Sequence, residues 1–448
     1  MKVRRQQIMS KDIVSIVKQI AVNLGDYDKM LHRVTDQSNI RVWNGISYPA
    51  WEPATLSHGI PGICLLYGKL MECFPEEEIW ANLAHKYLGY LVKEINSMGI
   101  RTLSMFSGAA GIGLAVASVS NNFTNYGKLL NSINSYILSY YDSIYNINTN
   151  KIGVSSVYYD VIEGLTGVLS YCSIFYNHEK FRRVLLDGLS KLVSLTDDIM
   201  VDGKNVPAWF ISSDNQFSEV EKALYPYGNF NTSFSHGITG PLAFLADMKS
   251  KGIVVEGQEG AINKIMQFLF DYRQSDGKRD FWKGQIDFRE FINGKLSNEN
   301  IVRRDAWCYG NPGICYAILK AGKAMKKSEW TNYALDNIKK TMTDIKGVFS
   351  PTFCHGFAGL YQILNSLEII MKEGAFADEK KKLLDKIMGY YDPLYPYGFK
   401  NIEVGDDQGD IRAFEYIGAL DGTVGVCLAL LDGEFGGESL WKKAFVLA

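Results

Sequence analysis

A Gly-x-x-Gly motif followed by an apolar run occurs seven times along the 448-residue chain. The first glycines of the seven copies are separated by 49, 56, 73, 73, 46 and 66 residues. These glycines are Gly59, Gly108, Gly164, Gly237, Gly310, Gly356 and Gly422. One such motif is a weak signal, but recurrence at a period of tens of residues is typical of architectures in which one supersecondary unit packs on the next.

Amphipathic segments lie between the motifs, for example 77–95 and 180–195. Their apolar residues recur at i, i+3, i+4 and i+7 against a polar face, which predicts outer helices. The segments after the glycines are apolar on most faces and predict buried inner helices. Seven such pairs predict an all-α fold, an α/α toroid of seven inner and seven outer helices. An open solenoid is the alternative, but it would need polar end caps. We expect the glycines to supply positive φ angles and close backbone approach in the loops.

One ring of seven units accounts for residues 1–448 as a single domain, although length alone would allow two or three. Lys and Arg number 47 and Asp and Glu 49, for a formal net charge of −2, so a phosphate-binding nucleic-acid surface is not expected. No apolar run approaches the roughly 18 residues of a membrane span. The basic start of the chain has no apolar signal region after it, and the seven cysteines are an odd number. Both features favour a cytoplasmic protein with free thiols.

Two stretches interrupt the repeat, 201–235 and 275–303, and both flank the fourth motif. The second has short alternating runs and the turn signal Asn293-Gly294, which predicts a small strand-bearing insertion. We expect these stretches, and 275–303 above all, to form an inserted lobe over one rim of the ring.

The residue before the first glycine is polar, or has a polar tip, in every copy. These residues are His58, Ser107, Glu163, His236, Tyr309, His355 and Asp421. One position earlier, only the fifth and sixth copies have cysteine, Cys308 and Cys354. Because consecutive repeats are neighbours in a ring, Cys308, Cys354 and His355 are expected to meet at one rim. Two thiolates and an imidazole suit Zn²⁺, and three ligands with an open position are typical of a catalytic zinc.

A pair of buried cysteines beside a core histidine is the alternative interpretation of this group. The other cysteines serve as an internal comparison. Cys64, Cys315 and Cys427 each lie five residues after the first glycine of their copy, inside the expected inner helices. We interpret these three as packing residues.

Neighbouring copies supply titratable groups. His236 belongs to the fourth copy and Asp160 precedes the glycine of the third, so the two are expected to pair and fix the imidazole tautomer. A helix cap for Asp160 and a core or capping position for His236 are the alternatives. Arg304 could hold a developing anion or a carboxylate, and Tyr309 could donate a proton or a hydrogen bond, although both also fit ordinary rim residues.

The motifs WCYGNPG at 307–313, FCHGFAG at 353–359 and SHGITG at 235–240 resemble those of the lanthionine synthetase C-like cyclases, the class I lantibiotic cyclases. The resemblance spans residues 57–430. It implies an α/α toroid with one zinc ion at a rim, held by Cys308, Cys354 and His355. It also implies that His236 is an acid or base, that Asp160 is its partner, and that Arg304 and Tyr309 belong to the site. The lobe at 275–303 resembles one thought to engage the peptide substrate.

The family's reaction adds cysteine thiols of a precursor peptide to dehydroalanine or dehydrobutyrine, which forms (methyl)lanthionine thioether rings. The resemblance therefore implies a dehydrated lantibiotic precursor peptide as substrate. It also suggests a complex with a dehydratase and an ABC exporter at the inner face of the cell membrane. His236 and metal-bound water are alternative sources of the proton that the product needs.

Three other functions fit parts of the pattern. A glutathione- or peptide-binding zinc protein of the same fold would lack cyclase activity. A prenyltransferase β-subunit would use an Asp, Cys and His zinc site and an α partner. A toroidal glycosidase would use two carboxylates, for which the rim offers Glu163 and Asp421, but it has no use for two cysteines and a histidine.

Overall fold

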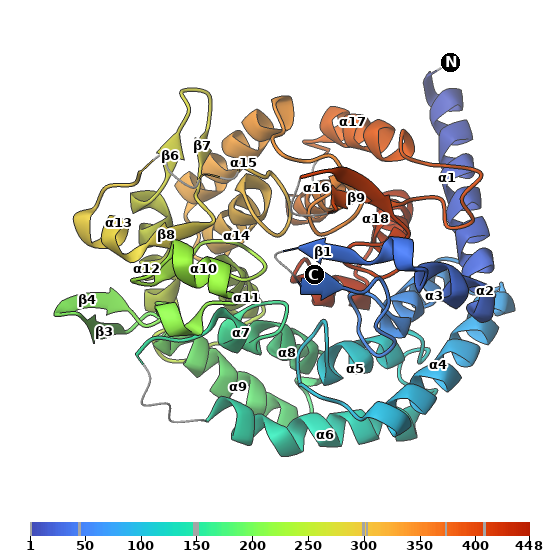
Figure 1. The fold of residues 1–448 in the computed structure, drawn as a ribbon, viewed down its shortest axis with the longest axis horizontal. Helices are drawn as coiled ribbons and strands as arrows, with labels where there is room; N and C mark the ends of the chain where they lie inside the picture. Colours follow the sequence, from blue (N-terminus) through green and yellow to red (C-terminus); the bar gives the residue numbers. More distant parts are fainter. Residues whose placement is uncertain are drawn as a thin grey trace.

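The computed structural model describes residues 2–43, 46–146, 152–297, 301, 303–371, 374–405 and 409–448. A helix begins within each Gly-x-x-Gly motif, one or two residues after the first glycine, and these inner helices surround the centre of the molecule (Figure 1). They are α3 (Ile60–Cys73), α5 (Ala109–Ser118), α8 (Leu165–Cys172), α11 (Thr239–Ser250), α14 (Asn311–Ala324), α16 (Phe357–Met371) and α18 (Thr423–Phe435). Every residue of α8 is buried, as the apolar composition of these segments predicts.

An outer helix packs on each inner helix. The outer helices are α1 (Lys2–Leu24), α4 (Glu78–Met98), α6 (Gly127–Tyr145), α9 (Glu179–Ser194), α12 (Gln258–Asp271), α15 (Ser328–Thr343) and α17 (Ala377–Met388). In α9 the buried residues include Phe181, Val184, Leu185, Leu189 and Leu192, which form one apolar stripe. The expected amphipathic pattern therefore faces the inner layer.

Successive inner helices contact one another, and α18 contacts α3, so the array closes on itself. The predicted α/α toroid is confirmed, and the open solenoid is wrong. Closure leaves no terminal repeat whose apolar face would need a cap. No helix in the part of the chain that the structure describes is long and apolar enough to cross a membrane.

The second glycine of every motif packs against the loop that precedes it. A Cβ atom at Gly359 would lie 2.1 Å from the carbonyl oxygen of Phe353, six residues earlier, and the same clash recurs at this spacing in all seven copies. The expectation of positive φ angles at the first glycines is wrong for most copies: φ is −135° at Gly59 and −119° at Gly422, whereas Gly310 has φ 91°. Close backbone approach therefore explains the motif.

Backbone hydrogen bonds join the loops before the inner helices, each to the loop of the next repeat. The donor–acceptor pairs are Leu56 N to Phe106 O, Phe106 N to Ile162 O, Val161 N to Ser235 O, Phe234 N to Cys308 O, Cys308 N to Cys354 O, Cys354 N to Leu420 O and Ala419 N to Leu56 O. We call this closed set the loop ring. It fixes the position of each rim side chain relative to those of its two neighbours.

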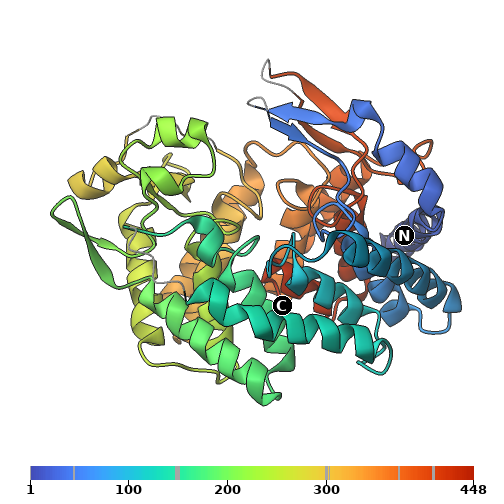
Figure 2. The ribbon, with the colours of Figure 1, turned by 60° about the horizontal axis from the view of Figure 1, so that its bottom comes forward.

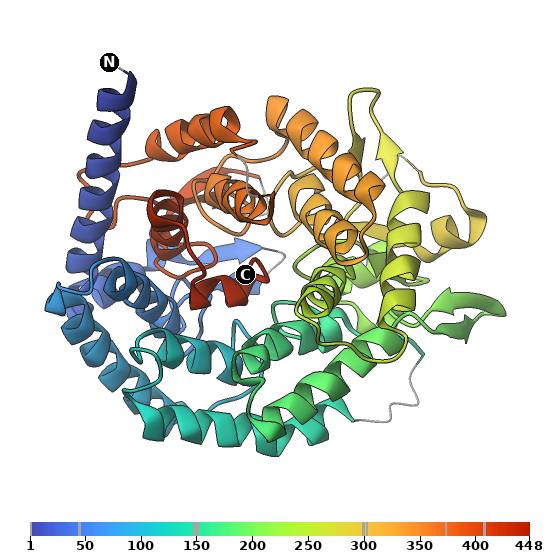
Figure 3. The ribbon, with the colours of Figure 1, turned by 180° about the vertical axis from the view of Figure 1, so that it is seen from behind.

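The C-terminal segment fills the middle of the toroid (Figure 3). It contains the 3-10 helix η4 (Leu440–Phe445). The Phe445 ring lies 5.5 Å from the Phe106 ring, 5.3 Å from the Trp307 ring and 3.9 Å from the Phe353 ring, measured between centroids. The inner layer therefore surrounds a packed core, not an open channel.

Residues from both interrupting stretches form one structure beside the rim, which we call the inserted lobe. It contains α10 (Glu219–Leu224), β5 (Asn229–Asn231), β6 (Gln274–Ser275), β7 (Asp280–Phe281), β8 (Gln285–Asp287) and α13 (Phe288–Asn293), and the hairpin β3 (Asp198–Val201) and β4 (Lys204–Pro207) lies next to it. The antiparallel pairing of β5 with β8 joins the two stretches. Residues 298–300 and 302 of the expected lobe lie outside the described residues.

The turn signal Asn293-Gly294 marks the end of a helix and not a connection between two strands. These residues end α13, and Gly294 adopts a left-handed conformation with φ 61° after the helix. Asp287 and Glu290 form a capping box that begins α13, and this favours a helix over the alternating strand that the pattern predicted.

A second set of strands, which the sequence pattern did not predict, lies over the first and last repeats. The strands are β1 (Arg41–Trp43), β2 (Ile46–Tyr48), β9 (Asn401–Val404) and β10 (Ile411–Phe414), which form two antiparallel hairpins next to the short helix α2 (Tyr27–Val34). Arg41 Nε donates to Val404 O at 2.8 Å and joins the two hairpins, which we call the hairpin pair. Figure 2 shows the inserted lobe in green and yellow, and the hairpin pair in blue and red, on the same side of the ring.

Candidate metal centre and its neighbours

The loop ring brings Cys308, Cys354 and His355 together. Cys308 N donates to Cys354 O at 3.2 Å, so the two cysteines lie on adjacent loops although 46 residues separate them. One ligand atom from each of the three side chains lies within 4.8 Å of the others. No other group of three His, Cys, Asp or Glu side chains meets this spacing among the residues that the structure describes.

The two thiols share a site that favours one negative charge and resists a second. A hydrogen bond from Cys354, together with His355 and Arg304, lowers the pKa of the Cys308 thiol to about 5, although burial opposes this. The pKa of Cys354 is raised, since its thiol donates that hydrogen bond and a second thiolate would repel the first. A divalent cation would remove this repulsion and ionise both thiols. The donor set therefore fits a soft divalent metal such as zinc.

Two carboxylates surround His355. Its Nε2 lies 2.6 Å from Oε2 of Glu403, and its Nδ1 lies 3.6 Å from Oδ1 of Asp421. Burial opposes protonation of His355, but the Asp421 charge and the contacts with Cys308 and Glu403 outweigh it and raise the pKa to about 10. Burial likewise opposes ionisation of Glu403, but His355 and Arg304 lower its pKa to about 2. The two carboxylates therefore favour a positive charge at His355, and a metal ion bound there would also supply one.

His236 and Asp160 form a close pair on the neighbouring loops. His236 Nδ1 lies 2.6 Å from Oδ2 of Asp160, whose side chain is fully buried, while 27% of the His236 side chain is exposed. The other oxygen, Oδ1, accepts hydrogen bonds of 2.7 Å from the backbone N–H groups of Glu163 and Gly164 at the start of α8. Burial opposes protonation of His236, but Asp160 outweighs it and raises the pKa. Asp160 therefore both holds the loop that leads into α8 and orients the imidazole.

Tyr309 and Arg304 belong to the loop of the fifth repeat. Tyr309 directly follows Cys308, and Arg304 lies four residues before that cysteine. The Tyr309 hydroxyl accepts a hydrogen bond of 3.3 Å from Asn231 Nδ2 of the inserted lobe, and burial raises its pKa. Arg304 Nη2 lies 4.0 Å from Oε1 of Glu403, so it pairs with a protein carboxylate. All seven predicted site residues thus lie on or directly before the loop ring.

The inserted lobe braces the loop that leads to Cys308. Arg279, which precedes β7, forms a buried ion pair with Asp305 at 2.6 Å. Asp305 Oδ2 also accepts a hydrogen bond of 2.7 Å from Lys346 N. A buried ion pair with further hydrogen bonds fixes geometry even where its net contribution to stability is small.

Sequence reasoning missed two residues at this site. Glu403 lies on β9, outside the repeat, and no motif marks it. Phe217 begins the segment that leads into α10, and its half-exposed ring lies 5.1 Å from the His236 ring. The sequence places Asp421 at the rim in the seventh copy, and the structure places it beside His355.

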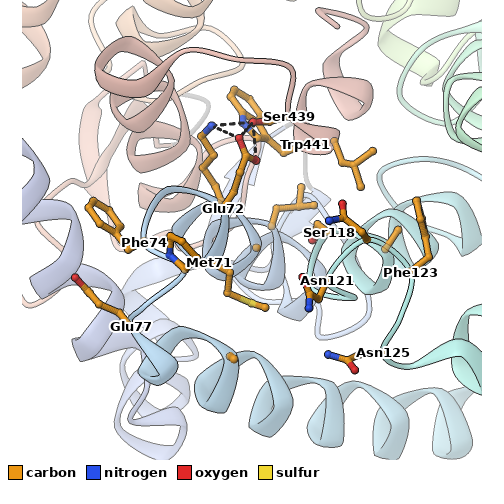
Figure 4. Close-up of a pocket in the computed structure, with 18 of the residues that line it drawn as sticks. Met71, Glu72, Phe74, Glu77, Ser118, Asn121, Phe123, Asn125, Ser439 and Trp441 are labelled. Carbon is orange, nitrogen blue, oxygen red and sulfur yellow. Dashed lines mark hydrogen bonds and ion pairs between the residues drawn. The ribbon is translucent and has the colours of Figure 1, made fainter.

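A cavity of about 530 Å³ lies on the opposite face, near the C-terminal ends of α3 and α5 and beside η4 (Figure 4). Its buried Lys69 ammonium binds Glu72 Oε1 and Ser439 Oγ, each at 2.8 Å. These contacts satisfy the ammonium within the protein. None of the seven predicted site residues lines this cavity.

Three comparisons relate this geometry to known proteins. The family model of the lanthionine synthetase C-like proteins matches residues 50–446. The chain is 30% identical over 399 residues to the nisin biosynthesis protein NisC of Lactococcus lactis subsp. lactis, with 88% of each chain covered. Its structure is similar to that of a nisin cyclase, with a TM-score of 0.78, 26% sequence identity and 98% of each chain covered.

Proposed function

The chain belongs to the lanthionine synthetase C-like protein family, and on that premise we propose that it is a zinc-dependent lanthionine-forming cyclase. The proposed substrate is a dehydrated lantibiotic precursor peptide. The observation that carries the proposal is the group of two thiols and one imidazole at the rim, next to a histidine–aspartate pair. An association with a dehydratase and an ABC exporter, and a cytoplasmic location, remain predictions.

The proposed reaction is an addition in which no electrons are gained or lost overall. The thiol loses its proton, sulfur bonds to the β-carbon of the dehydro residue, and the π electrons move toward the α-carbon and its carbonyl. A proton then adds to the α-carbon. The chemistry needs a thiolate near neutral pH, whereas a free cysteine has a pKa of about 8.5.

Cys308, Cys354 and His355 would hold the metal, and when bound it supplies a positive charge that ionises the substrate thiol. Asp160 occupies Nδ1 of His236, which leaves Nε2 as the nitrogen that exchanges a proton with the peptide. A histidine so oriented can take the thiol proton or deliver a proton to the α-carbon. The family resemblance supports both roles for this pair equally.

Tyr309 and the inserted lobe have proposed roles at the substrate. Because its raised pKa keeps the Tyr309 hydroxyl protonated, it can donate a hydrogen bond to the carbonyl oxygen on which negative charge develops. Phe217 offers a half-exposed apolar surface beside His236, against which the peptide can pack. The lobe would thus hold the peptide over the rim.

The deciding experiment is cyclisation of a peptide that contains one dehydroalanine and one cysteine. Addition does not change the peptide mass, so unreacted thiol is counted by alkylation and mass spectrometry. We expect the purified protein to make the peptide resistant to alkylation, and a chelator to abolish this. A protein that contains zinc and binds the peptide but forms no thioether would instead be a peptide-binding relative.

A further inference from the structure

Glu403 approaches the metal centre from outside the repeat. It lies on β9 of the hairpin pair, yet its carboxylate reaches the loop of the sixth repeat, where Oε2 lies 2.6 Å from His355 Nε2. Only 5% of its side chain is exposed. A buried carboxylate needs compensation, and Arg304 Nη2 provides it 4.0 Å from Oε1.

The hairpin is tied to the loop that carries two of the ligands. Asn401 Oδ1 accepts hydrogen bonds from Ser350 Oγ at 3.1 Å and from Thr352 Oγ1 at 3.4 Å. Ile402 N donates to Ser350 Oγ at 3.1 Å. Ser350 and Thr352 lie four and two residues before Cys354 in the chain. The strand and the ligand loop are therefore held as one unit.

The carboxylate itself is also fixed in its orientation. Val404 N donates to Glu403 Oε1 at 3.0 Å, which leaves Oε2 directed at the imidazole. The Glu403 carboxylate lies against Nε2, whereas the contact of 3.6 Å between Nδ1 and Asp421 Oδ1 is too long for a hydrogen bond. The ring nitrogen that remains for a metal is therefore Nδ1. A ligating histidine whose second nitrogen donates to a carboxylate is held in one tautomer and is a more basic ligand.

From these contacts we propose that Glu403 is a positioning residue for the metal centre, which holds the proton of His355 on Nε2 and presents Nδ1 beside Cys308 and Cys354. The inference rests on the proposed metal site. Two thiolates would balance a divalent ion, and Arg304 lies beside Glu403. The Asp421 carboxylate near Nδ1 adds one further negative charge that favours a cation at this place. Arg304 would then act on the metal through Glu403.

The test compares zinc affinity in the absence of any peptide, by competition with a chromophoric chelator. The variants are Glu403→Ala, Glu403→Gln and the control Glu415→Gln. Glu415 lies just beyond β10 and pairs with Arg33 and Lys400, away from the ligands. We expect Glu403→Ala to bind zinc about 10–100-fold more weakly, as loss of such a partner typically does. Glu403→Gln should lose less, because its amide oxygen can accept from Nε2, and the control should match the parent.

A second measurement separates positioning from misfolding. Circular dichroism of the metal-free variants should match the parent. The absorption of the Co²⁺-loaded Glu403→Ala protein should keep the thiolate charge-transfer bands, with shifted ligand-field bands from the displaced imidazole. Zinc binding by Glu403→Ala as tight as that of the parent would overturn the inference.

The outcomes distinguish this inference from the proposed function. A parent that binds no zinc overturns both. A parent that binds zinc, with an unaffected Glu403→Ala variant, overturns the inference alone. A parent that forms no thioether, with a weakened Glu403→Ala variant, overturns the cyclase and supports the inference.

Discussion

The first two repeats and the fifth and sixth repeats share one backbone arrangement but differ in what it carries. At the same position of the loop ring the first pair has Ser57 and Phe106, and the second pair has Cys308 and Cys354. Phe106 packs on Phe445 in the core, whereas the two cysteines lie against each other. The ring itself is therefore general, and the identity of a few side chains makes one part of it a candidate metal centre.

The largest effect is expected where a ligand is removed. Cys354→Ala leaves two of the three ligands, so we expect no bound zinc and no detectable thioether formation. The fold should survive, because the apolar core of the inner helices does not depend on the metal. Zinc analysis and the alkylation assay on the purified variant check this.

The matched control is Cys427→Ala, which removes a buried thiol of α18 in the seventh repeat. It should keep its zinc and its activity. Full zinc occupancy in Cys354→Ala would contradict the prediction that the fifth and sixth repeats carry the metal ligands.

A smaller effect is expected at the fourth repeat. His236→Asn should keep its zinc but react about 10²–10⁴-fold more slowly in a single turnover, since the proton has lost its donor or acceptor. A zinc-free variant would show that His236 is a ligand. A fully active variant would show that no proton passes through this residue.

Asp160→Asn should alter the pH dependence of the reaction. The amide oxygen can still accept the two hydrogen bonds from the start of α8, but the charge that raises the His236 pKa is lost. If His236 delivers a proton, activity falls as pH rises through its pKa, and this falling limb should move to lower pH in the variant. Single-turnover rates between pH 5 and 9 test this, and an unchanged profile would contradict it.

The smallest effect is expected at the rim of the first repeat. His58 Nε2 lies 3.9 Å from Oδ2 of Asp421, too far for a hydrogen bond, so His58→Ala should leave the zinc affinity and the rate unchanged. Weaker zinc binding by this variant would show that the first repeat also contributes to the metal centre. The difference between the first repeats and the fifth and sixth would then be smaller than we propose.

The toroid and the meeting of Cys308, Cys354 and His355 follow from the sequence because both depend on the repeat. The same register places His236 next to Asp160, since each lies at the start of an inner helix in consecutive copies. Periodic features of this kind are encoded locally and recur seven times, so each copy supports the interpretation of the others.

Glu403 and the hairpin pair could not be predicted in this way. Glu403 reaches His355 through the fold, 48 residues further along the chain, and its strand is only four residues long. Short hairpins depend on partners from elsewhere, here Arg41 and Ser350, which no local pattern reveals. The helix at Phe288–Asn293 has a different origin, because its capping box of Asp287 and Glu290 is a local signal that outweighed the alternation.

The loop ring also decides how an ion would be taken up. In small zinc domains the free energy of metal binding is folding free energy, because no site exists before the metal arrives. Here the closed backbone ring orders the ligand loops beforehand, so the entropy of ordering them belongs to the folding of the toroid. Binding would bury little new apolar surface and should have a heat-capacity change close to zero. The protein would then behave as a rigid chelator, whose affinity depends on ligand basicity and geometry and not on the ordering of the chain.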